Sequence, residues 1–113
     1  MTSTFHFTDK SGYNAIRATT DWRFKASQPP PETHPFGAYF TTLPPDTPKL
    51  AKKLLIARSK IECVFSFEDA GDLTALRGGR GQFIFFSETD YIVEAKRQRF
   101  SGEAEAWKSV EQT

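Results

Sequence analysis

The sequence predicts one α+β domain made of two small antiparallel sheets and two or more short helices. Its 113 residues suffice for a single hydrophobic core and are too few for two. Eleven phenylalanines and a hydrophobic content of 38% supply the apolar area that such a core buries. Helical segments do not alternate regularly with strand-like segments along the chain, which disfavours a doubly wound parallel sheet.

The first quarter of the chain predicts a strand, a helix and a second strand. Residues 4–7 alternate polar and aromatic side chains, as a half-buried strand requires. Thr8 and Asp9 follow, and their short side-chain oxygens suit the cap of a helix that ends near residue 18. Residues 21–27 alternate apolar and charged side chains, which predicts a strand with one face in water.

The middle of the chain predicts a loop, a strand and a helix. Four prolines make residues 28–35 an extended surface loop, for which a functional role and a tolerated insertion both stay open. Residues 36–42 return to strand character. Thr47 as N-cap and Pro48 at the first helical position predict a helix start. A basic cluster follows, which fits either a solvated face or an anionic partner: Lys49, Lys52, Lys53, Arg58 and Lys60.

The second half predicts three more strands. Residues 61–67 form an apolar strand in which Cys63 is expected to be a buried core residue rather than a reactive thiol. Residues 77–81 are a glycine turn flanked by arginines, without the spacing of a phosphate-binding loop. Residues 82–86 and 91–94 are the other two strands.

The predicted domain comprises residues 1–100, and residues 101–113 are expected to be a flexible tail or a frayed helix. No apolar run approaches the roughly 18 residues that a membrane-spanning helix needs. The first five residues also lack the basic and apolar regions of a signal peptide. We therefore expect a soluble cytoplasmic protein without a membrane partner, and delivery as an effector stays open.

Charge and composition exclude several classes of function. The net charge of +1 disfavours nucleic acid as the main partner. The single cysteine excludes an internal disulfide framework and a cysteine-rich metal site. His6 and His34 do not have metal-ligand spacing, so no metal site is expected.

Three segments carry residues that are suited to chemistry. His6 ends a strand and opens a helix, where free N–H groups gather. Gly37 lies in an aromatic strand, where a glycine permits close approach of a ligand to the backbone. Glu88 and Asp90 share one face of an extended segment. Each has a structural alternative: a hydrogen-bonded histidine, a core strand and a polar turn.

Taken together, these segments resemble ADP-ribosyltransferases. The closest resemblance, carried by residues 6–16 and 37–45, is to the toxin-like HYD1-type group. The run Gly37-x-Tyr39-Phe40 also resembles poly(ADP-ribose) polymerases, and residues 90–93 resemble the strand of that family that begins with the catalytic acid. The resemblance implies two antiparallel sheets that hold NAD, the substrate, in a cleft.

The resemblance also implies roles for individual residues. His6 would hydrogen-bond a ribose hydroxyl, and the backbone of Phe7 would hold the nicotinamide amide. Tyr39 would line the nicotinamide pocket, with Thr8 and Phe40 in the same binding set. Asp90 would be the catalytic acid, with Glu88 as the second choice. A carboxylate there stabilises the positive charge that develops when the nicotinamide–ribose bond breaks.

The implied activity is transfer of one ADP-ribose from NAD to an acceptor. This acceptor is either a macromolecule or a small molecule. An enzyme that is toxic to its own cell would also need an inhibitor protein. NAD hydrolysis is an alternative. Because the sequence has no second tyrosine on the following helix and has Asp in place of Glu, a non-catalytic binding module also stays open. A nucleic-acid-binding domain that uses the basic cluster is the remaining alternative. If the chain is a transferase, His6, Tyr39 and Asp90 should converge on one cleft.

Overall fold

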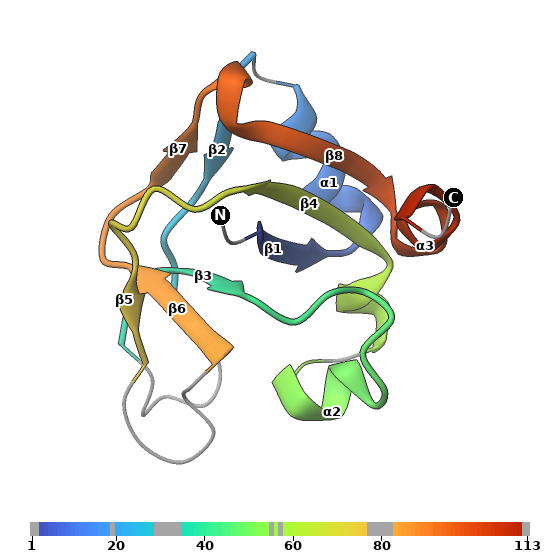
Figure 1. Ribbon diagram of the computed structural model, residues 1–113. Helices are drawn as coiled ribbons and strands as arrows, with labels where there is room; N and C mark the ends of the chain where they lie inside the picture. Colours follow the sequence, from blue (N-terminus) through green and yellow to red (C-terminus); the bar gives the residue numbers. More distant parts are fainter. Residues whose placement is uncertain are drawn as a thin grey trace.

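The computed structural model describes residues 3–18, 20–28, 35–54, 56, 58–76 and 83–111, with side chains as far as residue 107. They form two antiparallel sheets (Figure 1). The six-stranded sheet has the order β5-β6-β3-β1-β4-β8, and the two-stranded sheet pairs β2 with β7. The predicted α+β class with two antiparallel sheets is confirmed, and β1 lies near the centre of the larger sheet.

The strands are short, and helices separate several of them. The larger sheet contains β1 (Ser3–Thr8), β3 (Ala38–Thr41), β4 (Cys63–Glu68), β5 (Thr74–Ala75), β6 (Ile84–Ser87) and β8 (Gln98–Glu103). The smaller sheet contains β2 (Trp22–Phe24) and β7 (Tyr91–Val93). The helices are α1 (Lys10–Arg17), α2 (Leu50–Leu54), α3 (Ala104–Glu111) and the 3₁₀ segments η1 (Arg58–Ile61) and η3 (Ala95–Arg97).

The larger sheet has packing partners on both of its faces. One face packs against β2 and β7 in an aromatic core: Trp22, Phe24, Ala38, Phe40, Phe65, Phe67, Tyr91 and Val93. The other face packs against α3, where Trp107 contacts Phe5 edge to face at 5.6 Å. Along β1, Phe5 and Phe7 belong to the α3 side. His6 between them therefore points to the aromatic core, because side chains alternate along a strand.

The predicted helix after β1 is confirmed. Asp9 is its N-cap, and its carboxylate accepts the N–H of Gly12 at 2.8 Å. A Cβ on Gly12 would come within 2.1 Å of the Thr8 hydroxyl, so the first turn of α1 can lie this close to β1 only with glycine at that position. Tyr13 and Ile16 pack against the aromatic core, as an amphipathic helix requires.

The predicted start of the second helix is wrong by two residues. α2 begins at Leu50 rather than at Pro48. Thr47 does not cap the helix, because its hydroxyl donates to the Pro44 carbonyl at 2.7 Å within the preceding turn. Lys49 then adopts a φ of 55°, a left-handed conformation that a helical residue cannot have. Because of this turn, the helix begins two residues later in the sequence than predicted.

The C-terminal residues differ from the predicted tail. β8 continues to Glu103 and pairs with β4, and α3 follows at once. Trp107 is buried, so the hydrophobic effect holds this helix on the sheet. The boundary predicted at residue 100 is wrong for residues 101–107, which are part of the domain.

Two strands that follow each other in sequence separate into different sheets. β6 pairs with β3, whereas β7 pairs with β2. The burial of Cys63 and the strand around it are confirmed. The predicted turn at residues 77–81 and most of the proline loop, residues 29–34 with His34, lie outside the described residues.

Candidate functional site

A cavity of about 380 Å³ lies where β1, α1 and β2 meet. Phe24 and Ile16 give it apolar walls, and Arg23 and Lys25, both exposed, give it positive charge. Among the described residues, its lining is formed by His6, Gly12, Ala15, Ile16, Arg23, Phe24, Lys25 and Ser27. It is therefore a cationic pocket with an apolar wall, and it lies beside β1, the strand that contains His6.

His6 is neutral in this setting. Its ring lies among Phe24, Phe40 and Phe65, with ring centroids at 4.7, 5.5 and 6.5 Å. Burial lowers the pKa of His6 to about 4, and the hydrogen bond to the Tyr39 carbonyl opposes this only in part. The surrounding aromatic rings thus remove the charge that an exposed histidine gains in mild acid.

The hydrogen bond of His6 also fixes which nitrogen carries the proton. Nδ1 lies 2.9 Å from the Tyr39 carbonyl oxygen, which can only accept, so Nδ1 is the donor. In a neutral ring Nε2 is then an unprotonated acceptor. Among the described residues, every buried side-chain nitrogen or oxygen has a hydrogen-bond partner. Nε2 of His6 has no such partner among these residues, so this atom is not buried and stays accessible. His6 can accept a hydrogen bond from a hydroxyl group.

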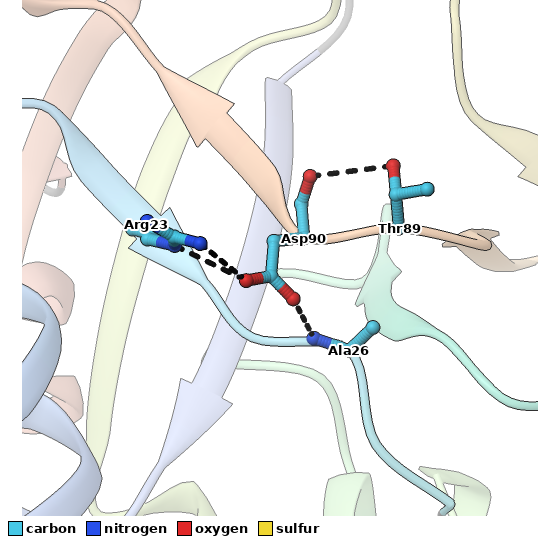
Figure 2. Close-up of polar contacts among 4 residues, drawn as sticks. All are labelled: Arg23, Ala26, Thr89 and Asp90. Atoms are coloured by element: carbon cyan, nitrogen blue, oxygen red, sulfur yellow. Dashed lines mark hydrogen bonds and ion pairs between the residues drawn. The ribbon is translucent and has the colours of Figure 1, made fainter.

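Asp90 is held by β2 and by the segment that follows it (Figure 2). Its Oδ2 accepts from Arg23 Nε at 3.1 Å and from Arg23 Nη2 at 2.9 Å, and its Oδ1 accepts from the Ala26 N–H at 2.8 Å. The Ala26 N–H and then the Arg23 guanidinium lower the pKa of Asp90. The predicted catalytic acid is therefore ionised and already engaged, and it shares Arg23 with the cavity.

Tyr39 does not join His6. Phe5 of β1 pairs with Thr41 of β3, so the residue opposite His6 is Phe40, and both rings point into the aromatic core. Tyr39 consequently points to the opposite face, where it stacks on Phe86 at 5.5 Å. The predicted convergence is wrong for Tyr39, because side chains alternate along β3. What Tyr39 gives the site is its backbone carbonyl.

The other predicted residues also divide between the two faces. Phe7 stacks on Phe5 on the α3 side, at a centroid distance of 6.3 Å. Phe40 is part of the aromatic core, and Thr8 is buried beside Gly12. Glu88 is exposed between β6 and β7. Contacts of these residues with NAD stay predictions.

Gly37 serves the fold rather than a ligand. A Cβ at this position would lie 2.5 Å from the Ser87 carbonyl oxygen. Its own N–H and carbonyl also pair with Ser27, which joins the start of β3 to the end of the β2 segment. The close backbone approach expected at Gly37 exists, but the approaching group is a neighbouring strand.

Arg23 and Lys25 line the cavity but were not predicted as site residues from the sequence. The alternation of apolar and charged residues at 21–27 predicts only that these two side chains lie on the solvent-exposed face of a strand. The available signal was two cations on either side of Phe24, in the strand that follows the His6 helix. Only the packing of α1 against β2 and β1 brings them to His6.

Other site chemistry is limited within the described ranges. They contain no group of three His, Cys, Asp or Glu residues that is arranged to hold a metal ion. Cys63 is buried, and burial raises the pKa of its thiol, which makes it unreactive at neutral pH. No helix in the part of the chain that the structure describes is long and apolar enough to cross a membrane.

No family model matches the chain, and none of the curated proteins or solved structures is significantly similar to it. Function is therefore inferred from the cavity and its residues. The resemblance to ADP-ribosyltransferases stays a prediction.

Proposed function

We propose that the His6 cavity binds NAD and that the chain is a mono-ADP-ribosyltransferase. The reaction breaks the bond between nicotinamide and ribose and passes ADP-ribose to an acceptor. The observation that carries the proposal is a neutral histidine acceptor in the same cavity as two cations. A ribose hydroxyl and a pyrophosphate need those two kinds of group.

The cavity offers a partner for each part of such a ligand. The Nε2 atom of His6 accepts from a ribose hydroxyl, and Arg23 and Lys25 attract the pyrophosphate. Phe24 and Ile16 provide apolar surface for a ring. The volume of about 380 Å³ lies in the usual range for small-molecule sites.

Asp90 acts in this proposal once Arg23 turns to the phosphates. The departing nicotinamide takes the electron pair of the broken bond, and positive charge spreads over ribose C1′ and the ring oxygen. A carboxylate nearby stabilises that charge. The acceptor then attacks C1′ and loses its proton to solvent or to a base. The Ala26 N–H keeps Asp90 in place throughout.

A binding module without turnover is the second candidate. It is favoured by the hydrogen bonds on both oxygens of Asp90 and by the position of Tyr39 on the other face of the sheet. In this case the Arg23–Asp90 ion pair persists when NAD is bound.

Nicotinamide release from NAD, measured with and without cell lysate, separates these functions, and titration calorimetry measures NAD binding. Labelled ADP-ribose attached to lysate components identifies a transferase. Release without lysate identifies an NAD glycohydrolase, and binding without release identifies the binding module. The absence of NAD binding would overturn the proposal.

A double variant, Arg23→Gln with Lys25→Gln, tests whether the cavity is the site. We expect it to weaken NAD binding about tenfold or more, because two charged donors are lost. Lys96→Gln is the control, since Lys96 is exposed on η3 and does not line the cavity. An equal loss in the control would indicate a general effect of net charge.

A further inference from the structure

A second hollow, of about 560 Å³, lies over α2 and η1. We call it the α2 groove. Its lining consists of Pro45, Thr47, Lys49, Leu50, Ala51, Lys52, Arg58 and Ile61. None of these residues lines the His6 cavity, so the two hollows are separate surfaces.

The α2 groove carries three cations: Lys49, Lys52 and Arg58. All three are exposed, and none has an ion pair among the described residues. Lys60 of the same basic cluster differs, because it pairs with Asp9 at 2.7 Å. No acidic residue is among those that line the groove. None of the three cations is therefore engaged in an ion pair within the described part of the chain.

Like charges around one hollow repel one another, and a polyvalent anion between them removes that repulsion. The guanidinium of Arg58 can hold phosphate oxygens through two parallel N–H groups, and the two lysines add point charges. An acidic peptide would spread its charges along an extended chain at roughly 3.3 Å per residue. A chain of adjacent phosphates carries several negative charges in one short segment, which suits three cations that line one hollow.

Apolar residues also line the groove. Ala51 and Ile61 are only partly buried and keep some apolar surface accessible, whereas Leu50 and Pro45 are buried. A ligand with a phosphate chain at one end and a flat, weakly polar ring at the other matches this division. Contact of a base with Ala51 and Ile61 would exclude water from apolar surface on both sides.

We propose that the α2 groove binds a nucleoside polyphosphate, with its phosphate chain among Lys49, Lys52 and Arg58. This site does not depend on NAD binding at His6, because it uses other elements of the fold. The proposed ligand combines a chain of negative charges with a ring.

Titration calorimetry of the full chain tests the site, with ATP, inorganic tripolyphosphate and adenosine as probes. We expect ATP to bind more tightly than tripolyphosphate, and adenosine to show no measurable binding. Lys52→Gln should weaken ATP binding about tenfold, since one charged contact is lost. Lys53→Gln is the matched control: it removes the same charge from the next residue of α2, which does not line the groove.

Three results would overturn the proposal. Equal weakening by Lys52→Gln and Lys53→Gln would show an effect of overall charge. Loss of ATP binding in the Arg23→Gln, Lys25→Gln variant with no effect of Lys52→Gln would place ATP in the His6 cavity. A single-stranded oligonucleotide that displaces ATP whether or not it carries a terminal phosphate would identify a nucleic-acid backbone site. Equal thermal midpoints of the variants verify that each is folded.

Discussion

The His6 cavity and the α2 groove both carry positive charge, but their polar groups are in different states. In the cavity, His6 donates to the Tyr39 carbonyl and Arg23 is paired with Asp90. In the groove, Lys49, Lys52 and Arg58 form no ion pair with the described residues. A phosphate bound in the cavity must displace Arg23 from Asp90, whereas a ligand of the groove displaces no ion pair of the described residues.

This difference sets what each site can distinguish. The cavity presents one neutral acceptor with a fixed tautomer, so it selects for a hydroxyl donor at a defined place. The groove presents three charges on exposed side chains, so it selects mainly for negative charge. Binding in the cavity should depend on geometry, and binding in the groove on ionic strength.

The largest effect is expected at Asp90, the residue that connects the cavity to catalysis in the proposed function. Asp90→Asn retains the acceptor for the Ala26 N–H and removes the charge. Nicotinamide release should fall about 10²–10³-fold while NAD affinity changes little, because the charge acts mainly in the transition state. Steady-state release assays measure this.

Glu88→Gln is the comparison for that variant, since Glu88 is exposed two residues earlier. We expect it to reduce transfer to an acceptor and to leave NAD hydrolysis intact. If Glu88→Gln abolishes all release and Asp90→Asn is harmless, the roles of the two acids are exchanged.

The next effect concerns NAD affinity. His6→Phe retains an aromatic ring in the core but removes the acceptor, so NAD binding should weaken about 10–100-fold. Tyr39→Phe should leave the affinity unchanged, because its side chain lies on the other face of the sheet. Calorimetry on both variants compares them. Weaker NAD binding by Tyr39→Phe together with unchanged binding by His6→Phe would place the NAD site on the face of the sheet that carries Tyr39.

A smaller effect is the pH dependence of stability. The pKa of His6 is about 4 in the folded chain and 6.5 in an exposed histidine, so the unfolded state binds more protons between these values. Stability therefore falls as the pH decreases through this window, by about 2 kcal/mol between pH 7 and pH 5. Urea unfolding measures the change.

His6→Gln isolates the contribution of His6, because an amide can still donate to the Tyr39 carbonyl but does not titrate. We expect the variant to lose much less stability between pH 7 and pH 5 than the parent chain. The same loss in both proteins would show that His6 is not the titrating group.

The smallest effect is that of salt, and it compares the two hollows directly. Raising ionic strength from about 0.05 M to about 0.5 M should weaken tripolyphosphate binding at the α2 groove several-fold, because exposed charges are screened. NAD binding at the cavity should weaken less. Equal salt dependence would mean that the cavity also binds through charge alone.

Local signals predicted several elements well. The alternation of residues 4–7 gave β1, and Asp9 gave the start of α1, because both depend on neighbours in sequence. The second helix start failed because the Thr47 hydroxyl bonds the Pro44 carbonyl instead of the helix. The tail failed because Trp107 reaches Phe5, a contact between the two ends of the chain that no local pattern contains.

The site was predicted in part for the same reason. His6 was predicted to end a strand and open a helix, but it lies inside β1, which continues to Thr8. Arg23 and Lys25 were not predicted as site residues, since their place beside His6 depends on how α1 packs between β1 and β2. Asp90 was identified as an acid at the start of a strand, but its engagement with Arg23 follows from the pairing of β2 with β7.

The sequence by itself determined the α+β class, the strand at residues 4–7 and the alternation that separates His6 from Phe5 and Phe7. Only the tertiary structure decided that Tyr39 lies on the opposite face from His6, because this depends on the register in which Phe5 meets Thr41. A shift of one residue would move every side chain of β3 to the other face. This register places Ala38 and Phe40 of β3 in the aromatic core against the β2–β7 pair, and these contacts are made only in the folded chain.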